Sequence, residues 1–353
     1  MNFASDNVTG AAPEILAAIA AANDGAAMPY GNDAVTQRVE AALKALFERD
    51  LAAFPVATGS AANALALATM CPPYGAVYCH PDSHINVDEC GAPELFTGGA
   101  KLVPIVGDAG KIAAADFEAA LARSGKGVVH HVQPAAISLT NASEMGTVYT
   151  PEEVRAIADI AHGQGLRVHM DGARFANAVA ALGCAPADLA WRAGVDVLSF
   201  GATKNGALAA EAVVFFDAAL AESFGYRRKR GGHLFSKMRF VSAQLEAYLK
   251  DGLWLKHASH ANEMARRLAE GLRRIPGVEQ LYPVEANEVF ARIPDRAIKG
   301  AFADGYVFYR WSGEADETCR LVCAFNTDPR DVDGLLQSIS RHVAAGAPSR
   351  KRA

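Results

Sequence analysis

Cysteine is scarce in this sequence, and long apolar runs are absent from it. The 353 residues include six cysteines, which is too few for a disulfide framework. Cys319 and Cys323 lie four residues apart, but no histidine or second cysteine pair stands near them at zinc-site spacing. No apolar run approaches the ~20 residues of a membrane-spanning helix, and residues 1–9 lack the regions of a secretory signal. We therefore expect reduced thiols, no metal site, no membrane segment and a cytoplasmic location.

The chain also lacks an excess of positive charge and the common nucleotide-binding motifs. Its 34 Lys and Arg stand against 39 Asp and Glu, a net charge of −5, whereas binding to nucleic acids or membrane surfaces depends on concentrated positive charge. No G-x-G-x-x-G follows the first predicted strand and no Walker lysine loop is present, which disfavours a nucleotide-binding enzyme. Hydrophobic residues, by contrast, make up 51% of the chain, enough for a large core.

Short apolar runs alternate with helical patterns over the first two thirds of the chain. Thr150, Pro151 and Glu153 have the residue types of a helix start: a capping hydroxyl, a proline at the first position and a glutamate at the third. The apolar runs are short and bounded by turn residues, as strands buried on both faces are. We predict an α/β fold, a mostly parallel seven-stranded sheet with helices on both faces. The expected strands are residues 53–57, 76–79, 101–106, 127–132, 166–170, 195–200 and 212–216.

The pattern changes after about residue 233. A long helical stretch reaches about residue 271, short strand-like runs follow at 288–292, 306–311 and 320–325, and a final helix begins at about Pro329. This order is typical of a smaller α+β domain. We therefore expect a large domain over residues 1–240, whose N-terminal segment lines the active site, and a small C-terminal domain over 241–353.

An acid and an arginine follow the fifth predicted strand. Asp171 and Arg174 come directly after the apolar run that ends at Met170. In an open parallel sheet, ligands lie beyond the carboxyl ends of the strands, which is where these two side chains would be. The alternative is a structural one, in which Asp171 caps the next helix and Arg174 is a surface partner.

A lysine follows the next strand. Lys204 lies among small residues, in Gly201-Ala202-Thr203-Lys204-Asn205-Gly206, after an apolar run. Small neighbours leave room for a bulky planar adduct, and partial burial favours a neutral, nucleophilic amine. An exposed loop lysine is the alternative if this segment is taken alone.

A glycine and a serine open the helix after the first predicted strand. Gly59, Ser60 and Ala61 follow Thr58 there, and free backbone N–H groups at a helix start suit a phosphate. Combined with Lys204 and Asp171, this segment indicates pyridoxal 5′-phosphate. The helix start would take its phosphate, the lysine its aldehyde as a Schiff base, and the aspartate its pyridine nitrogen.

The sequence resembles the pyridoxal-phosphate enzymes of aspartate-aminotransferase fold, and more narrowly the low-specificity L-threonine aldolases of the β-eliminating lyase family. The likeness covers essentially the whole chain. It rests on Ser5-Asp6-Asn7-Val8-Thr9, Tyr30-Gly31-Asn32-Asp33, Thr58-Gly59-Ser60-Ala61-Ala62-Asn63, residues 169–174, Lys204, the basic run at 227–232 and Arg320-Leu321-Val322.

The resemblance implies a role for each matching residue. Lys204, Asp171 and His84 would be catalytic, with the His84 ring stacked on the cofactor. One of Arg228, Lys229 and Arg230 would reach the phosphate, from the same or a neighbouring subunit, and Arg230 is our choice. The cofactor-binding set is Gly59, Ser60, Ala61, His84, Asp171, Arg174, Lys204 and Arg230; the substrate-binding set is Ser5, Tyr30, Arg174 and Arg320.

The reaction implied is cleavage of an L-β-hydroxy-α-amino acid, such as L-threonine, L-allo-threonine or L-phenylserine, to glycine and an aldehyde. A homotetramer built of dimers is implied as well. Many relatives carry a second histidine in the segment that matches residues 138–144, and this chain has none there, so His84 or a water molecule is left as the base for the β-hydroxyl. The alternatives are another β-eliminating lyase or an aminotransferase, and a non-catalytic module that binds the cofactor.

Overall fold

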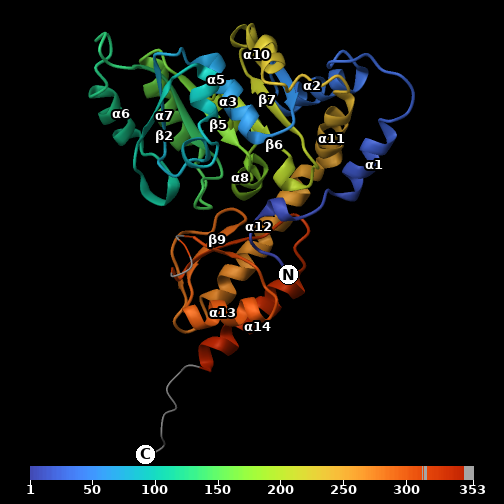
Figure 1. The fold of residues 1–353 in the computed structure, drawn as a ribbon, viewed down its shortest axis with the longest axis vertical. Coiled ribbons are helices and arrows are strands. Elements are labelled where there is room, and N and C mark those ends of the chain that lie inside the picture. Colours follow the sequence, from blue (N-terminus) through green and yellow to red (C-terminus); the bar gives the residue numbers. More distant parts are fainter. Residues whose placement is uncertain (312, 314–315, 346–353) are drawn as a thin grey trace, which may run out of the picture.

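Two sheets of different size organise the molecule. The computed structural model describes residues 1–311, 313 and 316–345, with a large part above a smaller one (Figure 1). The strands of the large sheet are β1 (Ala52–Val56), β2 (Gly75–Cys79), β3 (Lys101–Pro104), β4 (Gln133–Thr140), β5 (Arg167–Gly172), β6 (Val197–Gly201) and β7 (Glu211–Phe215).

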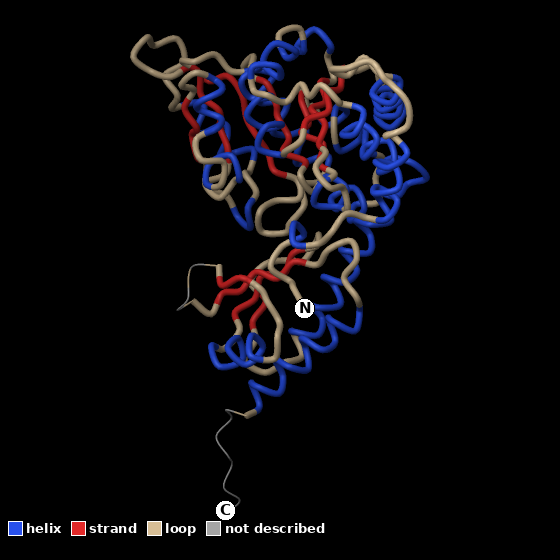
Figure 2. Tube along the Cα trace, turned by 45° about the vertical axis from the view of Figure 1, so that its right-hand side comes forward, coloured by secondary structure: helices blue, strands red, loops and turns tan. Residues whose placement is uncertain are grey.

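The large sheet is mostly parallel, which confirms the predicted fold class. Its strand order is β1-β7-β6-β5-β4-β2-β3. The five strands from β6 to β3 run parallel, whereas β7 runs antiparallel to both of its neighbours. Helices cover both faces, so β2, β6 and β7 are buried along their whole length (Figure 2). Since the sheet is parallel here, the carboxyl ends of β4, β5 and β6 lie together at one edge.

One predicted strand is wrong. Residues 127–132 form turns at the surface, where Val129 is 93% exposed, and the strand begins only at Gln133. The other six predicted strands overlap the observed ones, with ends that differ by one or two residues.

The large part contains most of the helices. Thr150 caps α7 as predicted, because its hydroxyl accepts from the Glu153 N–H while the Glu153 carboxylate accepts from the Thr150 N–H. The helices are α1 (Pro13–Ala21), α2 (Ala34–Phe47), α3 (Gly59–Met70), α4 (His84–Val87), α5 (Ala92–Thr97), α6 (Ala114–Ala122), α7 (Pro151–Gly163), α8 (Phe175–Leu182), α9 (Pro186–Leu189), α10 (Phe224–Arg230) and α11 (Arg239–Leu249).

The small part is a four-stranded antiparallel sheet with helices. Its strand order is β10-β11-β9-β8, from β8 (Glu279–Gln280), β9 (Glu288–Arg292), β10 (Tyr309–Arg310) and β11 (Thr318–Val322). The helices are α12 (Leu253–Leu272), α13 (Asp295–Ala303) and α14 (Pro329–Ala344). The long helix expected up to residue 271 is therefore two helices, since a turn at residues 250–252 separates α11 from α12.

Each part has its own apolar core, and α12 passes from one to the other. Trp254 and Ala258 belong to the core of the large part, whereas Met264 and Leu268 belong to that of the small part. The division at 240/241 stays a prediction, and this distribution of side chains favours a boundary inside α12.

The N-terminal segment crosses between the two parts. Phe3 lies in the small core, where its N–H donates to the carbonyl of Val307 and its carbonyl accepts from the N–H of Val322. The chain then turns through the 3₁₀ helix η1 (Asp6–Val8) before α1 begins. This path brings Ser5 and Asp6 to the junction of the two parts, where the N-terminus lies in Figure 1.

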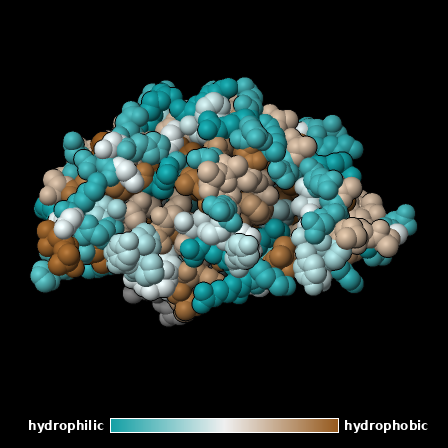
Figure 3. All heavy atoms as spheres, turned by 90° about the horizontal axis from the view of Figure 1, so that it is seen from above, coloured by the Kyte–Doolittle hydropathy of each residue, from teal (hydrophilic) through white to brown (hydrophobic). Residues whose placement is uncertain are grey.

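The surface of the large part carries mostly hydrophilic side chains with apolar ones between them, as the view from above shows (Figure 3). Within the described ranges, no helix combines the length and the apolar character needed to cross a membrane.

Candidate active site

Lys204 lies on a turn that is held on both sides. The 3₁₀ turn η4 (Thr203–Asn205) follows β6 directly. Before the lysine, the Ala202 N–H donates to Glu211 Oε2 over 3.1 Å. After it, the Asn205 amide donates to the Tyr248 hydroxyl and to the Trp254 carbonyl, both over 2.8 Å. The backbone on either side of Lys204 is thereby fixed, and its side chain is half-buried at the carboxyl edge of the sheet.

Asp171 lies one strand away and begins a chain of polar contacts. It is 4% exposed near the end of β5. Its Oδ1 accepts from the Ala173 N–H over 2.9 Å, and its Oδ2 accepts from the Asn63 amide of α3 over 2.9 Å. The same amide nitrogen donates to Glu89 Oε1 over 2.8 Å. A buried amide therefore joins the aspartate to a second carboxylate.

His84 stands at the other end of this chain. Its Nδ1 lies 2.8 Å from Glu89 Oε1, and the ring is 32% exposed while the glutamate side chain is sealed off. The hydrogen bond to Glu89 raises the pKa of His84 in spite of burial, with a further increase from the charge of Asp171. Burial raises the pKa of Glu89, which the hydrogen bonds from His84 and Asn63 oppose. His84 is thus held in one orientation by Glu89. Asp171 is linked to the same glutamate through the amide of Asn63.

Arg174 and Arg320 meet on one carboxylate. Arg320 donates to Glu288 Oε1 through Nε over 2.9 Å and through Nη2 over 2.6 Å. Arg174 Nη2 lies 3.4 Å from the same oxygen. Glu288 is 1% exposed and comes from β9, while Arg320 comes from β11. Two arginines that are far apart in the sequence are therefore brought together by the small part of the molecule.

A second acid holds Arg174. Asp6 accepts from Arg174 Nε over 2.8 Å and from Nη2 over 3.0 Å, and the Asn287 amide donates to Asp6 Oδ2 over 3.1 Å. Burial alone would raise the pKa of Asp6, but the charges of Arg174 and Lys204 outweigh it and lower that pKa. Nη1 of Arg174 and Nη1 of Arg320 keep no partner within the described residues, so one donor edge of each guanidinium remains for a ligand.

The model of the β-eliminating lyase family matches residues 2–295. The chain belongs to this family. It is 46% identical over 338 residues to the low specificity L-threonine aldolase of Pseudomonas aeruginosa, covering 96% of each chain. It is 44% identical over 344 residues to the enzyme of the same name from a Pseudomonas species, covering 97% of this chain and 98% of the other.

Solved structures agree with this assignment to the β-eliminating lyases. A threonine aldolase of Leishmania major superimposes with a TM-score of 0.90 at 28% identity, over 97% of this chain and 99% of the other. An aspartate aminotransferase of Rhodobacter sphaeroides gives 0.72 at 18% identity, over 99% and 94% of the two chains. The second likeness shows the shared fold alone.

The start of α3 fits the phosphate of this family's expected cofactor. The backbone N–H groups of Gly59 and Ser60 donate no hydrogen bond within the described part of the chain, and the space beside Gly59 is open. The Ala61 N–H, in contrast, already donates to the Thr58 hydroxyl over 3.2 Å. Two free donors at a helix N-terminus match an anion.

Arg228 is a better placed partner for that phosphate than Arg230. Arg230 is exposed at the end of α10, whereas Arg228 is 5% exposed and its Nη2 is buried with no hydrogen-bond partner among the described residues. Arg228 Nε donates to the His233 carbonyl over 3.3 Å, and the His233 ring accepts from the Ala57 N–H over 3.4 Å. Burial lowers the pKa of Arg228 to about 10. A buried arginine beside the start of α3, which pairs with no carboxylate in the described part of the chain, is suited to bind an anion such as a phosphate.

Two predicted substrate residues lie at the edges of this arrangement. The Ser5 hydroxyl accepts from the Asn7 N–H over 3.1 Å, next to the Asp6 that holds Arg174. Tyr30 is 45% exposed, and the Lys229 ammonium lies 4.7 Å from the centre of its ring. The structure thus groups Ser5 with the arginine pair and leaves Tyr30 at the surface.

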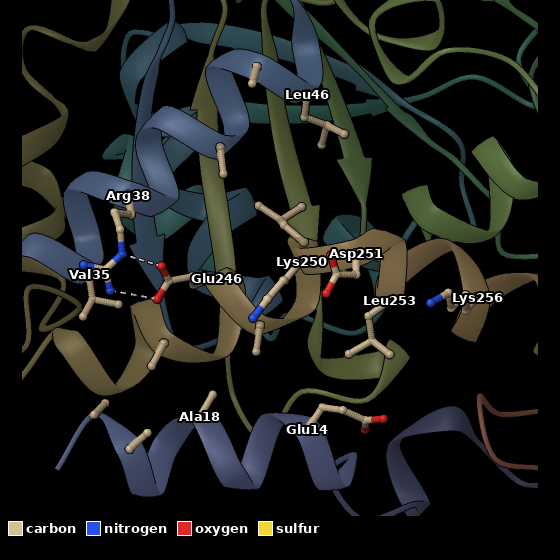
Figure 4. Close-up of a pocket in the computed structure, with 17 residues that line it drawn as sticks. Glu14, Ala18, Val35, Arg38, Leu46, Glu246, Lys250, Asp251, Leu253 and Lys256 are labelled. Atoms are coloured by element: carbon tan, nitrogen blue, oxygen red, sulfur yellow. Dashed lines mark hydrogen bonds and ion pairs between the residues drawn. The ribbon is translucent and has the colours of Figure 1, made fainter. Parts of the chain in front are cut away.

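A large groove lies away from these residues. A groove of about 1040 Å³ runs between α1, α2 and α11, with the Arg38–Glu246 ion pair across it (Figure 4). Glu14 and Ala18 of α1 line its opposite side. It contains none of the predicted site residues, so its size is no guide to the chemistry.

The structure adds acids and amides that the sequence reasoning missed. Five of them are buried or half-buried and contact a predicted residue directly: Asp6, Asn63, Glu89, Glu144 and Glu288. The buried Glu211 instead accepts from the N–H of Ala202, two residues before Lys204. A sequence signal existed for Glu288, because it is a carboxylate at the start of the predicted strand-like run 288–292.

Proposed function

We propose that this chain is a pyridoxal-phosphate-dependent L-threonine aldolase of low specificity. Its substrates are L-threonine, L-allo-threonine or related L-β-hydroxy-α-amino acids such as L-phenylserine, and its products are glycine and an aldehyde. The observation that carries the proposal is the pairing of Lys204 and Asp171 at the ends of neighbouring strands with an arginine pair beside them. The near full-length likeness to two enzymes named for this activity supports it.

The residues would hold the cofactor by its functional groups. Lys204 would carry the aldehyde carbon, and the Asp171 carboxylate would keep a proton on the pyridine nitrogen. The N–H groups of Gly59 and Ser60, with Arg228, would bind the phosphate. When bound, pyridoxal phosphate supplies an electron sink for the pair that is released at the substrate's Cα.

The remaining residues would orient the amino acid. The Nη1 groups of Arg174 and Arg320 would donate to its carboxylate, with the Ser5 hydroxyl close by. Asp6 and Glu288 fix the two guanidinium planes, so the carboxylate direction is set before the substrate arrives. A fixed carboxylate restricts rotation about the Cα bonds, which selects the bond to be broken.

A substrate panel tests the reaction class. Purified holoenzyme is mixed with L-threonine, L-allo-threonine or L-phenylserine, and aldehyde, glycine, ammonia and keto acid are measured. Glycine and aldehyde in equal amounts support the aldolase. Ammonia or keto acid without glycine would instead identify a β-eliminating lyase or an aminotransferase.

Replacement of Lys204 tests the assignment of the cofactor lysine. We expect Lys204→Ala to lose the visible absorbance of the lysine-bound cofactor and aldehyde release, because no other amine takes its place at the turn. Lys299→Ala is the matched control, since Lys299 is exposed in the small part and pairs with Asp295 one helical turn away. Wild-type turnover by Lys204→Ala would refute the assignment.

We also propose a homotetramer built of dimers and a cytoplasmic location. Exposed Tyr30, Lys229 and Arg230 are available for contacts between subunits. Six unpaired cysteines are in keeping with a reducing compartment. Light scattering on a size-exclusion column measures the assembly directly.

A further inference from the structure

Glu144 lies in the candidate active site, but the proposed function described above assigns no role to its carboxylate. It lies in the loop at residues 141–150 that follows β4, the strand beside β5. The backbone N–H of His84 donates to Glu144 Oε1 over 3.1 Å. Glu144 Oε2 has no hydrogen-bond partner in the described ranges, yet it is not among the side-chain oxygens sealed from solvent. One carboxylate oxygen is therefore anchored, and the other is available.

Charged groups from three different segments act on Glu144. Burial raises the pKa of Glu144; the positive charges of Lys204 and Arg174 lower it, and the negative charges of Asp171 and Glu288 raise it. These groups belong to η4, to the end of β5 and to β9. Glu144 therefore lies within electrostatic reach of both the lysine and the arginine pair.

The loop that carries Glu144 is held in place. The Asn141 amide donates to the Tyr149 carbonyl, and the Tyr149 N–H donates to Asn141 Oδ1, both over 3.1 Å, which closes the loop at its base. Gly146 has φ +75°, and a Cβ there would lie 2.9 Å from the carbonyl oxygen of Glu288, so the tip rests on β9. A side chain on such a loop is pre-positioned, as catalytic groups need to be.

We infer that Glu144 is a catalytic residue that takes the proton from the substrate's β-hydroxyl group. This inference rests on the proposed aldolase function. The Glu144 carboxylate accepts the proton, the O–H electron pair becomes the second bond of the new aldehyde, and the Cα–Cβ bond breaks. The pair from that bond stays at Cα, which takes a proton from water to give glycine. The proton on Glu144 returns to water, so no oxidant or further reactant is required.

His84 differs from Glu144 in how it is engaged. Its Nδ1 is held by Glu89, and that hydrogen bond raises the pKa of the ring. Glu144 keeps one carboxylate oxygen without a hydrogen-bond partner in the described ranges, and this oxygen can accept a proton without breaking a contact.

The Glu144→Gln variant separates proton transfer from placement. Glutamine keeps the oxygen that accepts from the His84 N–H but does not act as a base. We expect kcat/KM for L-phenylserine to fall by ~100-fold or more, the range typical of a lost general base. Exchange of the glycine α-hydrogens with deuterated water, followed by NMR, needs no β-hydroxyl base and stays at the wild-type rate. The dissociation constant for pyridoxal phosphate, measured by titration of the apoenzyme, also stays the same.

Glu285→Gln is the matched control. Glu285 is exposed, and its carboxylate accepts from the Val148 N–H over 2.7 Å, so it anchors the same loop from outside the site. We expect this variant to keep cleavage. The inference is overturned if Glu144→Gln cleaves normally, if it loses hydrogen exchange along with cleavage, or if Glu285→Gln loses as much activity. If the wild-type protein itself releases no glycine and aldehyde, this measurement refutes the proposed function. The inference about Glu144 is then refuted as well, because it rests on that function.

The pH dependence gives an independent readout. Glu144 acts in its deprotonated form, so wild-type kcat/KM falls as the pH drops through the pKa of Glu144. Burial raises that pKa, so the loss begins at higher pH than for an ordinary glutamate. The neighbouring titratable groups His84, Lys204 and Asp171 are present in both proteins. If the fall of kcat/KM at low pH is absent in Glu144→Gln, the inference is supported. If the variant shows the same fall as the wild type, the inference is contradicted.

Discussion

At the scale of single residues, the site depends on acids that hold cations in fixed directions. Asp6 and Glu288 together accept hydrogen bonds from four of the guanidinium nitrogens, two of Arg174 and two of Arg320. Taking such charges out of water is unfavourable unless each has a partner. The two arginines were expected at the substrate carboxylate because of the resemblance to the β-eliminating lyases. The sequence did not predict their partners, because those come from η1 and β9, whose approach depends on how the two parts pack.

Asp6→Asn tests the cost of an unpaired arginine. Removing one partner of a buried ion pair lowers the free energy of unfolding by ~3–5 kcal/mol, and Asp6 and Arg174 are 2% and 5% exposed. The pKa of Asp6 is lowered in the folded state, so its contribution is fully present above the unfolded pKa of ~3.9 and is lost as the pH falls through the folded value. Urea unfolding should therefore show a large difference from wild type at neutral pH and a smaller one in acid.

Asp159→Asn is the control for this measurement, since Asp159 is exposed on α7. It should unfold like the wild type at both pH values. Equal stability of Asp6→Asn and wild type at neutral pH would contradict the importance of the pair.

At the scale of elements, hydrophobic periodicity predicted the strands whose position is determined by the residue types of a short segment. Six strands of the large sheet were predicted because each is a short apolar run with turn residues on both sides. The run at residues 127–132 has the same composition, with three valines, but two of them are exposed. The true strand β4 begins with Gln133 and Pro134, and proline is typical of strand ends and edges. Only the pairing of β4 between β2 and β5 reveals that it is a central strand.

Thr150→Ala tests the helix start that the sequence predicted. Loss of the capping hydroxyl of α7 should lower the free energy of unfolding by ~1 kcal/mol, because the Glu153 N–H then loses its acceptor. Thr150→Ser keeps the hydroxyl and is the matched control. Chemical unfolding measures both, and an equal loss in the two variants would show that the methyl group, not the cap, is responsible.

At the scale of the whole molecule, the site is a product of both parts. Lys204 and Asp171 come from the large sheet, whereas Glu288 and Arg320 come from the small one, and the N-terminal segment inserts Asp6 between them. Sequence periodicity assigns each element to a part but contains no information on how the parts face one another. This is why the sequence offered candidates for the cofactor site one by one, while it gave no indication of the acid network between the parts.

Cofactor binding should stabilise the whole molecule through Arg228. A ligand that binds only the folded state adds about 2.7 kcal/mol when its free concentration is about 100 times Kd. In the apoenzyme, Arg228 is a buried cation whose Nη2 has no partner among the described residues, an unfavourable arrangement that a phosphate would relieve.

We therefore expect Arg228→Ala to leave the apoenzyme's unfolding midpoint unchanged or higher, while the upward shift on adding pyridoxal phosphate shrinks. Arg266→Ala, on the exposed face of α12, should shift like the wild type. Thermal unfolding at one protein concentration, with and without cofactor, compares the three proteins. A full wild-type shift in Arg228→Ala would show that the free N–H groups at the start of α3 bind the phosphate without this arginine, and that its burial has another cause.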